Sequence, residues 1–188
     1  MALFYKVSDK EFLTIKHKIF KEVGIPALEK NRFVKSPFSG IWFGEYDRNI
    51  NGYSYELCRL SNQHYLEIIS VDIVKGDEWI QIRLNIFELK PNNNSLKELN
   101  GVDGIQFHLP PNSITKMRLR IDDFKGMPLF RFVEHKIGTY YTKNGFESEV
   151  EKLRKLIKKD MTNIDHFVKR WHELHTPLVT DWKGNKIE

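Results

Sequence analysis

The sequence contains very little cysteine and no long apolar segment. Cys58 is the only cysteine among 188 residues, so no disulfide can form within the chain, and we expect its thiol to be buried. A single cysteine is typical of proteins in a reducing compartment. No apolar run approaches the roughly 18 residues that a membrane-spanning helix needs. The first residues show no basic segment followed by an apolar core, so we expect no secretory signal, a cytoplasmic protein and no membrane partner.

Motifs that identify many enzymes and metal proteins are also missing. The chain has no glycine-rich dinucleotide or phosphate loop, no nucleophile elbow and no cysteine–histidine zinc spacing. Glu88 and Lys90 match half of a nuclease motif, and Asp72 lies on the preceding predicted strand. In a hairpin that turns at residues 75–78, however, Asp72 lies opposite Gln81, roughly 23 Å from Glu88. We therefore predict no catalytic residues, no metal site and no cofactor.

What the sequence does have is the composition of one globular domain. Hydrophobic residues make up 40% and charged residues 29% of a chain long enough to bury one core, so we expect a single domain over residues 1–188. Of the net charge of +5, residues 101–188 carry +4. Lys and Arg are not clustered as densely as in typical nucleic-acid-binding proteins, so nucleic acid is a less favoured partner. Lys (21), Ile (18) and Asn (13) far outnumber Ala (2), which indicates an A/T-rich genome, bacterial or from a phage.

Helices are predicted at both ends of the chain. Near the start, Ser8 and Glu11 form a capping box, and the helix that they begin should end at Gly24 and Pro26. Near the end, apolar residues spaced three and four apart continue over residues 146–174. This pattern fits one long kinked helix and two consecutive helices equally well.

Between the helices, a period-two alternation of apolar and polar residues continues for nearly a hundred residues and predicts about seven strands. The predicted strands are 41–46, 53–60, 65–74, 79–89, 105–109, 115–121 and 127–135, with a long polar loop over 90–104 that holds a helical turn near 96–99. Short connections make successive strands antiparallel neighbours. The fold class is therefore α+β, in which an N-terminal helix precedes a curved antiparallel sheet and a long C-terminal helix packs on the apolar face of that sheet, with a short extra strand in the tail.

The alternation also places polar residues together on one face of the sheet. The candidate partner-binding residues are Gln81, Arg83 and Asn85 in one strand, Lys116, Arg118 and Arg120 in a second, and Arg131 in a third. Arginine in the middle of a strand is informative because its planar fork binds carboxylate or phosphate. The alternative interpretation is a solvated outer face whose arginines form ion pairs with Glu67 and Glu134.

These observations lead to three hypotheses about function. The first is a non-catalytic cytosolic binding protein that engages an acidic protein surface or an anionic ligand through the arginine-bearing face, as an immunity or phage–host conflict protein would. The second is a small-molecule carrier or sensor with a cavity between the sheet and the C-terminal helix, because the element order is similar to that of helix-grip proteins. The third is an enzyme that acts on a phosphate-containing substrate.

Overall fold

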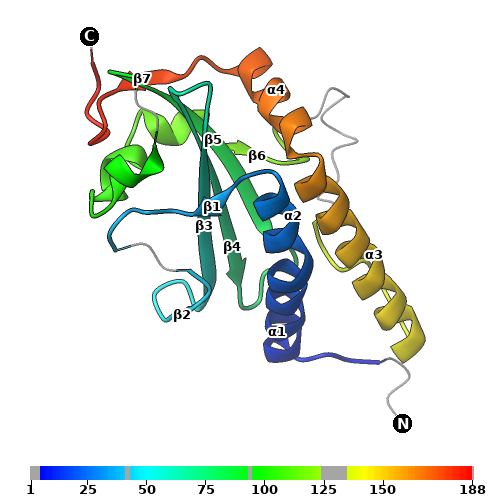
Figure 1. Cartoon of the computed structure of the whole chain (residues 1–188). Coiled ribbons are helices and arrows are strands. Elements are labelled where there is room, and N and C mark those ends of the chain that lie inside the picture. Colours follow the sequence, from blue (N-terminus) through cyan, green and yellow to red (C-terminus); the bar gives the residue numbers. More distant parts are fainter. Residues whose placement is uncertain (1–4, 41–42, 93–94, 124–134, 188) are drawn as a thin grey trace.

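The protein has three layers, with a seven-stranded sheet between a layer of helices and an irregular outer layer (Figure 1). The computed structural model describes residues 5–40, 43–92, 95–123 and 135–187. The helices are α1 (Asp9–Ile19), the π-helical turn η1 (Phe20–Gly24), α2 (Ile25–Lys30), α3 (Lys143–Thr162) and α4 (Ile164–Leu174), and three 3-10 helices are η2 (Leu96–Leu99), η3 (Gly104–Phe107) and η4 (Asn112–Thr115). The strands are β1 (Val34–Lys35), β2 (Tyr46–Asp47), β3 (Gly52–Ser61), β4 (Tyr65–Val74), β5 (Gln81–Leu89), β6 (Met117–Arg118) and β7 (Leu178–Thr180). This arrangement confirms the α+β class predicted from the sequence.

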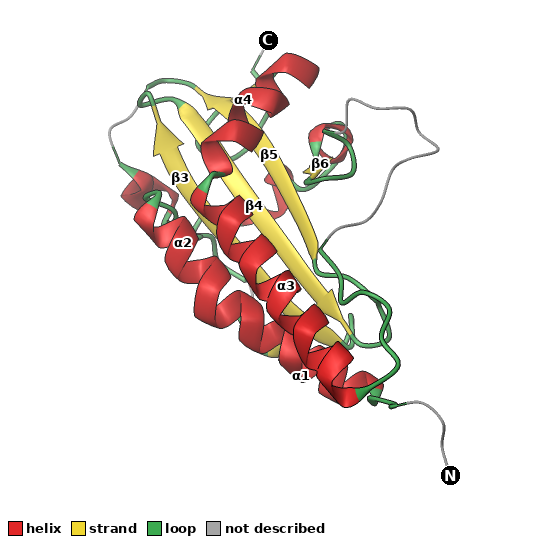
Figure 2. Ribbon diagram, turned by 90° about the vertical axis from the view of Figure 1, so that its right-hand side faces the viewer, coloured by secondary structure: helices red, strands yellow, loops and turns green. Residues whose placement is uncertain are grey.

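The sheet is built on the long hairpins that the alternation predicts. Its main order is β1–β3–β4–β5–β6, with β2 also paired to β3 and β7 paired to β5. The pairs are antiparallel, except that β7 runs parallel to β5. Asp72 lies opposite Gln81, as the hairpin register predicts. The helices α1 to α4 cover one face of this sheet (Figure 2).

The first helix begins where the sequence predicts, but it does not end there. Ser8 and Glu11 form the expected capping box. The predicted end at Gly24 is wrong, because the chain continues through η1 directly into α2. Pro26 lies in the first turn of α2, directly after this π-helical turn.

The C-terminal helical segment consists of two consecutive helices. α3 and α4 are separated at Asn163, whose main-chain φ of −103° and ψ of 31° depart from helical values. Both helices lie along the sheet (Figure 2). The indole of Trp171 is fully buried in the core beneath them, and its Nε1 donates to the carbonyl oxygen of Thr115 at 2.7 Å.

Two predicted strands are absent from the places where the alternation puts them. In the predicted strand 41–46, the described part contributes only Tyr46 to β2. Residues 105–109 form no strand because η3 occupies this segment, and the side chain of Asp103 accepts from the Ile105 N–H at its start. Phe107 instead packs on Phe38 and Phe87.

The predicted strand 115–121 is mostly a turn. Its strand β6 covers only Met117 and Arg118, followed by one main-chain bond from Leu119 to Ile82 of β5. The carboxylate of Asp122 accepts from the Arg118 N–H where the chain turns. Arg120 has a φ of 62°, which is incompatible with a strand. The predicted strand 127–135 lies outside the described residues, apart from His135.

Each face of the sheet has its own hydrophobic core. The larger core lies between the sheet and the helices, and it includes Leu57, Ile69, Leu84, Ile157 and Trp171. The smaller core lies under residues 95–116, which we call the outer segment, and its buried members are Phe38, Cys58, Leu66, Ile68, Phe87, Leu89, Leu99 and Phe107. The outer segment therefore covers the apolar end of this face and leaves the polar end uncovered. Within the described residues, no helix is both long and apolar enough to cross a membrane.

Candidate functional site

The polar end of the outer face is arranged in rows that cross the strands. Glu56, Ser70, Arg83 and Arg118 are successive register partners across β3, β4, β5 and β6. The neighbouring row holds Ser54, Asp72 and Gln81. Directly paired residues in a sheet project to the same side, so these side chains share one face.

A hollow of about 260 Å³ lies over these rows, against the outer segment. Its polar lining side chains are Ser54, Glu56, Ser70, Asp72, Arg83, His108 and Lys116, and we call this site the polar hollow. The strands contribute its floor, and the outer segment contributes His108 and Lys116 as a wall. Residues far apart in the sequence therefore meet here because the outer segment crosses the sheet.

Arg83 is held in place by a polar network on the floor of the hollow. Its guanidinium donates to the carboxylate of Asp72 and to the side-chain oxygen of Gln81. Gln81 in turn donates to Asp77 at 2.8 Å, and Ser54 donates to Asp72 at 2.9 Å. These contacts fix the planar fork of Arg83, so little further ordering is needed for it to bind a ligand.

Asn85 connects the sheet to the outer segment. Its side chain is 3% exposed, donates to the carbonyl oxygen of Asn112 at 3.0 Å and accepts from the hydroxyl of Thr115 at 2.6 Å. These bonds hold the chain just before Lys116 against β5. Asn85 is therefore a structural residue of the site, since both of its polar groups are occupied.

The arginines that the sequence suggests as a cluster do not all meet. Arg118 lies opposite Arg83, but its side chain is half exposed and pairs with Asp122 at 2.9 Å. Arg120 turns to the helix face of the sheet, where it donates to the buried carboxylate of Asp160 on α3. Arg131 lies outside the described residues. Of the three arginines that the structure describes, Arg83 is the one that lines the polar hollow.

The outer wall of the hollow contains a chain of three ionisable groups. The ammonium nitrogen Nζ of Lys116 lies 3.0 Å from Nδ1 of His108. Nε2 of His108 lies 2.9 Å from Oε2 of Glu56. This contact lacks hydrogen-bond alignment, and both Nε2 of His108 and Oε1 of Glu56 are buried without a hydrogen-bond partner in the described part of the chain.

The charges in the hollow leave one ammonium without a carboxylate partner. Asp72 forms an ion pair with Arg83, and Glu56 contacts His108. No carboxylate of the described residues lies within ion-pair distance of Lys116, and its ammonium contacts the imidazole of His108. Burial lowers the pKa of Lys116, and the nearby charge of Arg83 lowers it further, while Glu56 and Asp72 oppose this shift.

Glu56 and His108 are not among the site residues predicted from the sequence. Glu56 has a detectable signal, because it alternates with buried residues in a strand whose register brings it into line with Arg83. His108 has none, because its position depends on η3 replacing a predicted strand. The sequence does predict that Cys58 is buried, which is confirmed, and burial raises the pKa of its thiol to about 12.

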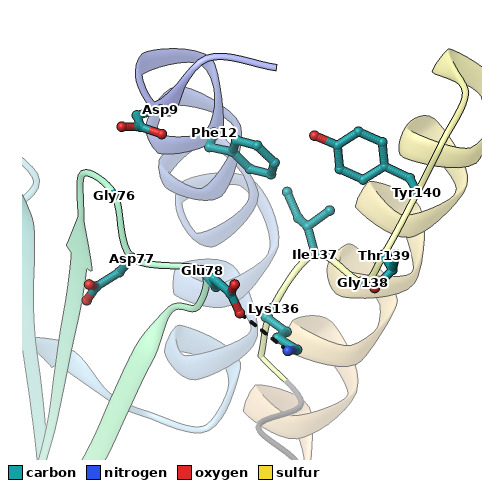
Figure 3. Close-up of a pocket in the computed structure, with 10 residues that line it drawn as sticks. All are labelled: Asp9, Phe12, Gly76, Asp77, Glu78, Lys136, Ile137, Gly138, Thr139 and Tyr140. Carbon is teal, nitrogen blue, oxygen red and sulfur yellow. Dashed lines mark hydrogen bonds and ion pairs between the residues drawn. The ribbon is translucent and has the colours of Figure 1, made fainter. Parts of the chain in front are cut away.

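A second hollow of about 300 Å³ lies where the start of α1, the turn between β4 and β5, and residues 136–140 meet (Figure 3). Phe12, Ile137 and Tyr140 line one part of it, while the carboxylates of Asp9 and Asp77 point away from the ring of Phe12 (Figure 3). Glu78 and Lys136 pair with one another at 3.4 Å. Because its polar groups do not converge, this hollow is a weaker candidate than the polar hollow.

No metal-binding arrangement of three or more His, Cys, Asp or Glu side chains occurs in the described residues. Comparisons of the chain with models of protein families, with curated proteins and with solved structures find no match. Function is therefore inferred from the geometry of the polar hollow.

Proposed function

We propose that this protein is a cytosolic binding protein that takes up a small anionic ligand, a carboxylate or phosphate, in the polar hollow. The observation that carries this proposal is the ammonium of Lys116, which lies half-buried at a concave site with no carboxylate partner in the described residues. Arg83 lines the same hollow and holds donors beyond the two bonds that it makes to Asp72 and Gln81. A partly buried cation with no carboxylate within ion-pair distance gains a charge-assisted hydrogen bond when an anion binds to it.

The hollow favours a small ligand over a flat acidic surface. Its volume of about 260 Å³ and its position below the wall formed by His108 and Lys116 suit a group of a few heavy atoms. The hypothesis of a carrier with a cavity beneath the helices is less favoured, because side chains of the larger core, among them Leu84, Ile157 and Trp171, pack between the sheet and the helices.

An acidic protein partner, as an immunity protein would have, is the second candidate. Ile105, Leu109 and Ile114 are 55%, 43% and 75% exposed in the same outer segment that carries His108 and Lys116. Exposed apolar side chains beside a cation are typical of a protein-binding surface. Replacing Ile114 by Asp separates the two candidates, because it would weaken a protein complex and leave the uptake of a small anion unchanged.

Calorimetric titration with inorganic phosphate and with acetate tests the proposal. Lys116→Met should weaken binding of the better ligand by about 10- to 100-fold, because a hydrogen bond to a charged group contributes about 1.5–3 kcal/mol. Lys155→Met on α3 is the matched control, since this side chain is 76% exposed and lies on the helix layer. Equal affinities for the Lys116→Met variant and the unaltered protein would refute the assignment.

A further inference from the structure

Lys116, His108 and Glu56 lie in line in the order of a nucleophile, a base and a carboxylate behind the base. Nζ of Lys116 lies 3.0 Å from Nδ1 of His108, and Nε2 of His108 lies 2.9 Å from Oε2 of Glu56. Proteins activate weak nucleophiles by placing a base within hydrogen-bond reach and a third group behind the base. A lysine amine in the first position reacts with carbonyl carbon.

The burial of Glu56 distinguishes these three groups from an ordinary surface cluster. The side chain of Glu56 is 6% exposed, and its Oε1 has no hydrogen-bond partner in the described part of the chain. An unsatisfied buried polar atom costs about 1–3 kcal/mol, so its retention calls for an explanation. Contacts of this kind are often poorly aligned in an unliganded site and tighten when substrate binds.

We propose that Lys116 forms an imine with a small anionic aldehyde or ketone, of which 2-oxo acids are the simplest class, while Arg83 holds the carboxylate of that ligand. This inference rests on the proposed binding of an anion in the polar hollow. It adds a covalent step, and it requires a carbonyl group beside the negative charge.

The protons of this step are accounted for by the groups present. The ammonium of Lys116 gives one proton to Nδ1 of His108, and the free amine attacks the carbonyl carbon, so that a C–N bond forms and the C=O π bond breaks. A second proton passes from nitrogen to the carbinolamine oxygen. His108 then returns its proton to that oxygen, which leaves as water, and the nitrogen lone pair forms the protonated imine. Glu56 is a positioning residue that stabilises the transient imidazolium of His108.

The electrostatics of the site support this chemistry. Burial and Arg83 lower the pKa of Lys116, against the opposing charges of Glu56 and Asp72. The neutral, nucleophilic amine is therefore more populated near neutral pH than in an exposed lysine. Lys155, which is 76% exposed, serves as the internal comparison.

Reductive trapping tests the proposal. The full chain is incubated with pyruvate and cyanoborohydride, and the modified lysines are identified by peptide mass mapping. We expect the reduced adduct on Lys116 to form at least about tenfold faster than on Lys155, and His108→Gln to slow it by about 100-fold. Lys116→Met should remove this adduct and leave the labelling of Lys155 unchanged.

The pH profile distinguishes a positioning role of Glu56 from a purely structural one. Glu56→Gln removes a negative charge near Lys116, so the rate of trapping should fall while its midpoint moves to lower pH. A general loss of folding would not move the midpoint, and circular dichroism checks the fold of each variant. Equal labelling of Lys116 and Lys155, or a rate unaffected by His108→Gln, would overturn the inference.

Phosphate titration of the same samples separates the two proposals. If phosphate binds through Lys116 and trapping is unselective, the imine is wrong and the anion site stands. If Lys116→Met changes neither phosphate affinity nor trapping, both proposals fail.

Discussion

A substitution at Lys16 would test how the helix layer is attached to the sheet. Its side chain is fully buried on α1, and its ammonium donates to the main-chain carbonyls of Val74, Asp77 and Trp79. The bonds to Val74 and Trp79 are long, at 3.3 Å and 3.5 Å, and the bond to Asp77 is the short one. One ammonium therefore connects the first helix to the turn between β4 and β5.

The Lys16→Met variant keeps most of the aliphatic side chain and removes the donor. A hydrogen bond to a charged group contributes about 1.5–3 kcal/mol net, and here one short bond and two long ones are lost. Removing the ammonium also relieves its cost of burial, so we expect a net loss of about 2–3 kcal/mol in the free energy of unfolding. For a chain of 188 residues this corresponds to a fall in Tm of about 8 °C.

Urea unfolding and calorimetry measure this loss, with the exposed Lys155→Met as a control that should change little. Burial lowers the pKa of Lys16, so the unfolded chain binds more protons between that lowered pKa and 10.5. The stability of the unaltered protein should therefore rise with pH across this window, and Lys16→Met should lack the rise. A Lys16→Met variant as stable as the parent at neutral pH would show that burying the ammonium costs as much as its bonds contribute, and would refute the reasoning.

Two further predictions concern buried groups elsewhere. Burial alone would raise the pKa of Asp160, but hydrogen bonds from Arg120 and His135 lower it below 3.8. The Asp160→Asn variant should therefore lose about 3 kcal/mol in its free energy of unfolding, measured with urea at pH 7. The difference in the free energy of unfolding between the parent and the Asp160→Asn variant should shrink as the pH falls through that lowered pKa. A difference that does not change with pH would contradict the ion pair. Cys58, with its pKa raised to about 12 by burial, should react with a thiol reagent at pH 8 only on unfolding, and rapid reaction of the native protein would contradict its burial.

The parts of the fold that the sequence predicts correctly depend on local patterns. The capping box at Ser8 requires residues three apart, and the register of Asp72 against Gln81 follows from one short turn. In β5, Ile82, Leu84 and Ile86 are each no more than 2% exposed, because the alternation of polar and apolar residues over 81–86 favours one choice of inner face.

Two of the incorrect strand predictions lie where a side-chain carboxylate accepts a hydrogen bond from the main chain. In the segment 115–121, Met117 and Leu119 are buried as alternation requires, yet the strand stops at Arg118. The carboxylate of Asp122 binds both the N–H and the guanidinium of Arg118 and makes a turn more favourable than continued pairing. Arg120 consequently projects to the opposite face, and no alternation rule could place it there.

Only part of the candidate site could be predicted, because local alternation identifies some of its residues and not others. Arg83 and Lys116 were identified because each belongs to an alternating segment, and they do line one hollow. Their partners Glu56 and His108 come together only when the outer segment crosses β3 to β5, which depends on the packing of Phe107 rather than on any local signal.

The buried cations of the helix face have several acceptors within the fold, since the ammonium of Lys16 donates to three main-chain carbonyls. On the helix face, Arg59 pairs with Glu67 at 2.6 Å and also donates to Asp165, so a buried charge is neutralised within the fold. On the outer face, the described residues give Lys116 no carboxylate and leave Oε1 of Glu56 without a hydrogen bond. In the described residues Lys116 thus has fewer acceptors than the buried cations of the helix face, which supports the proposal that an anion binds beside it.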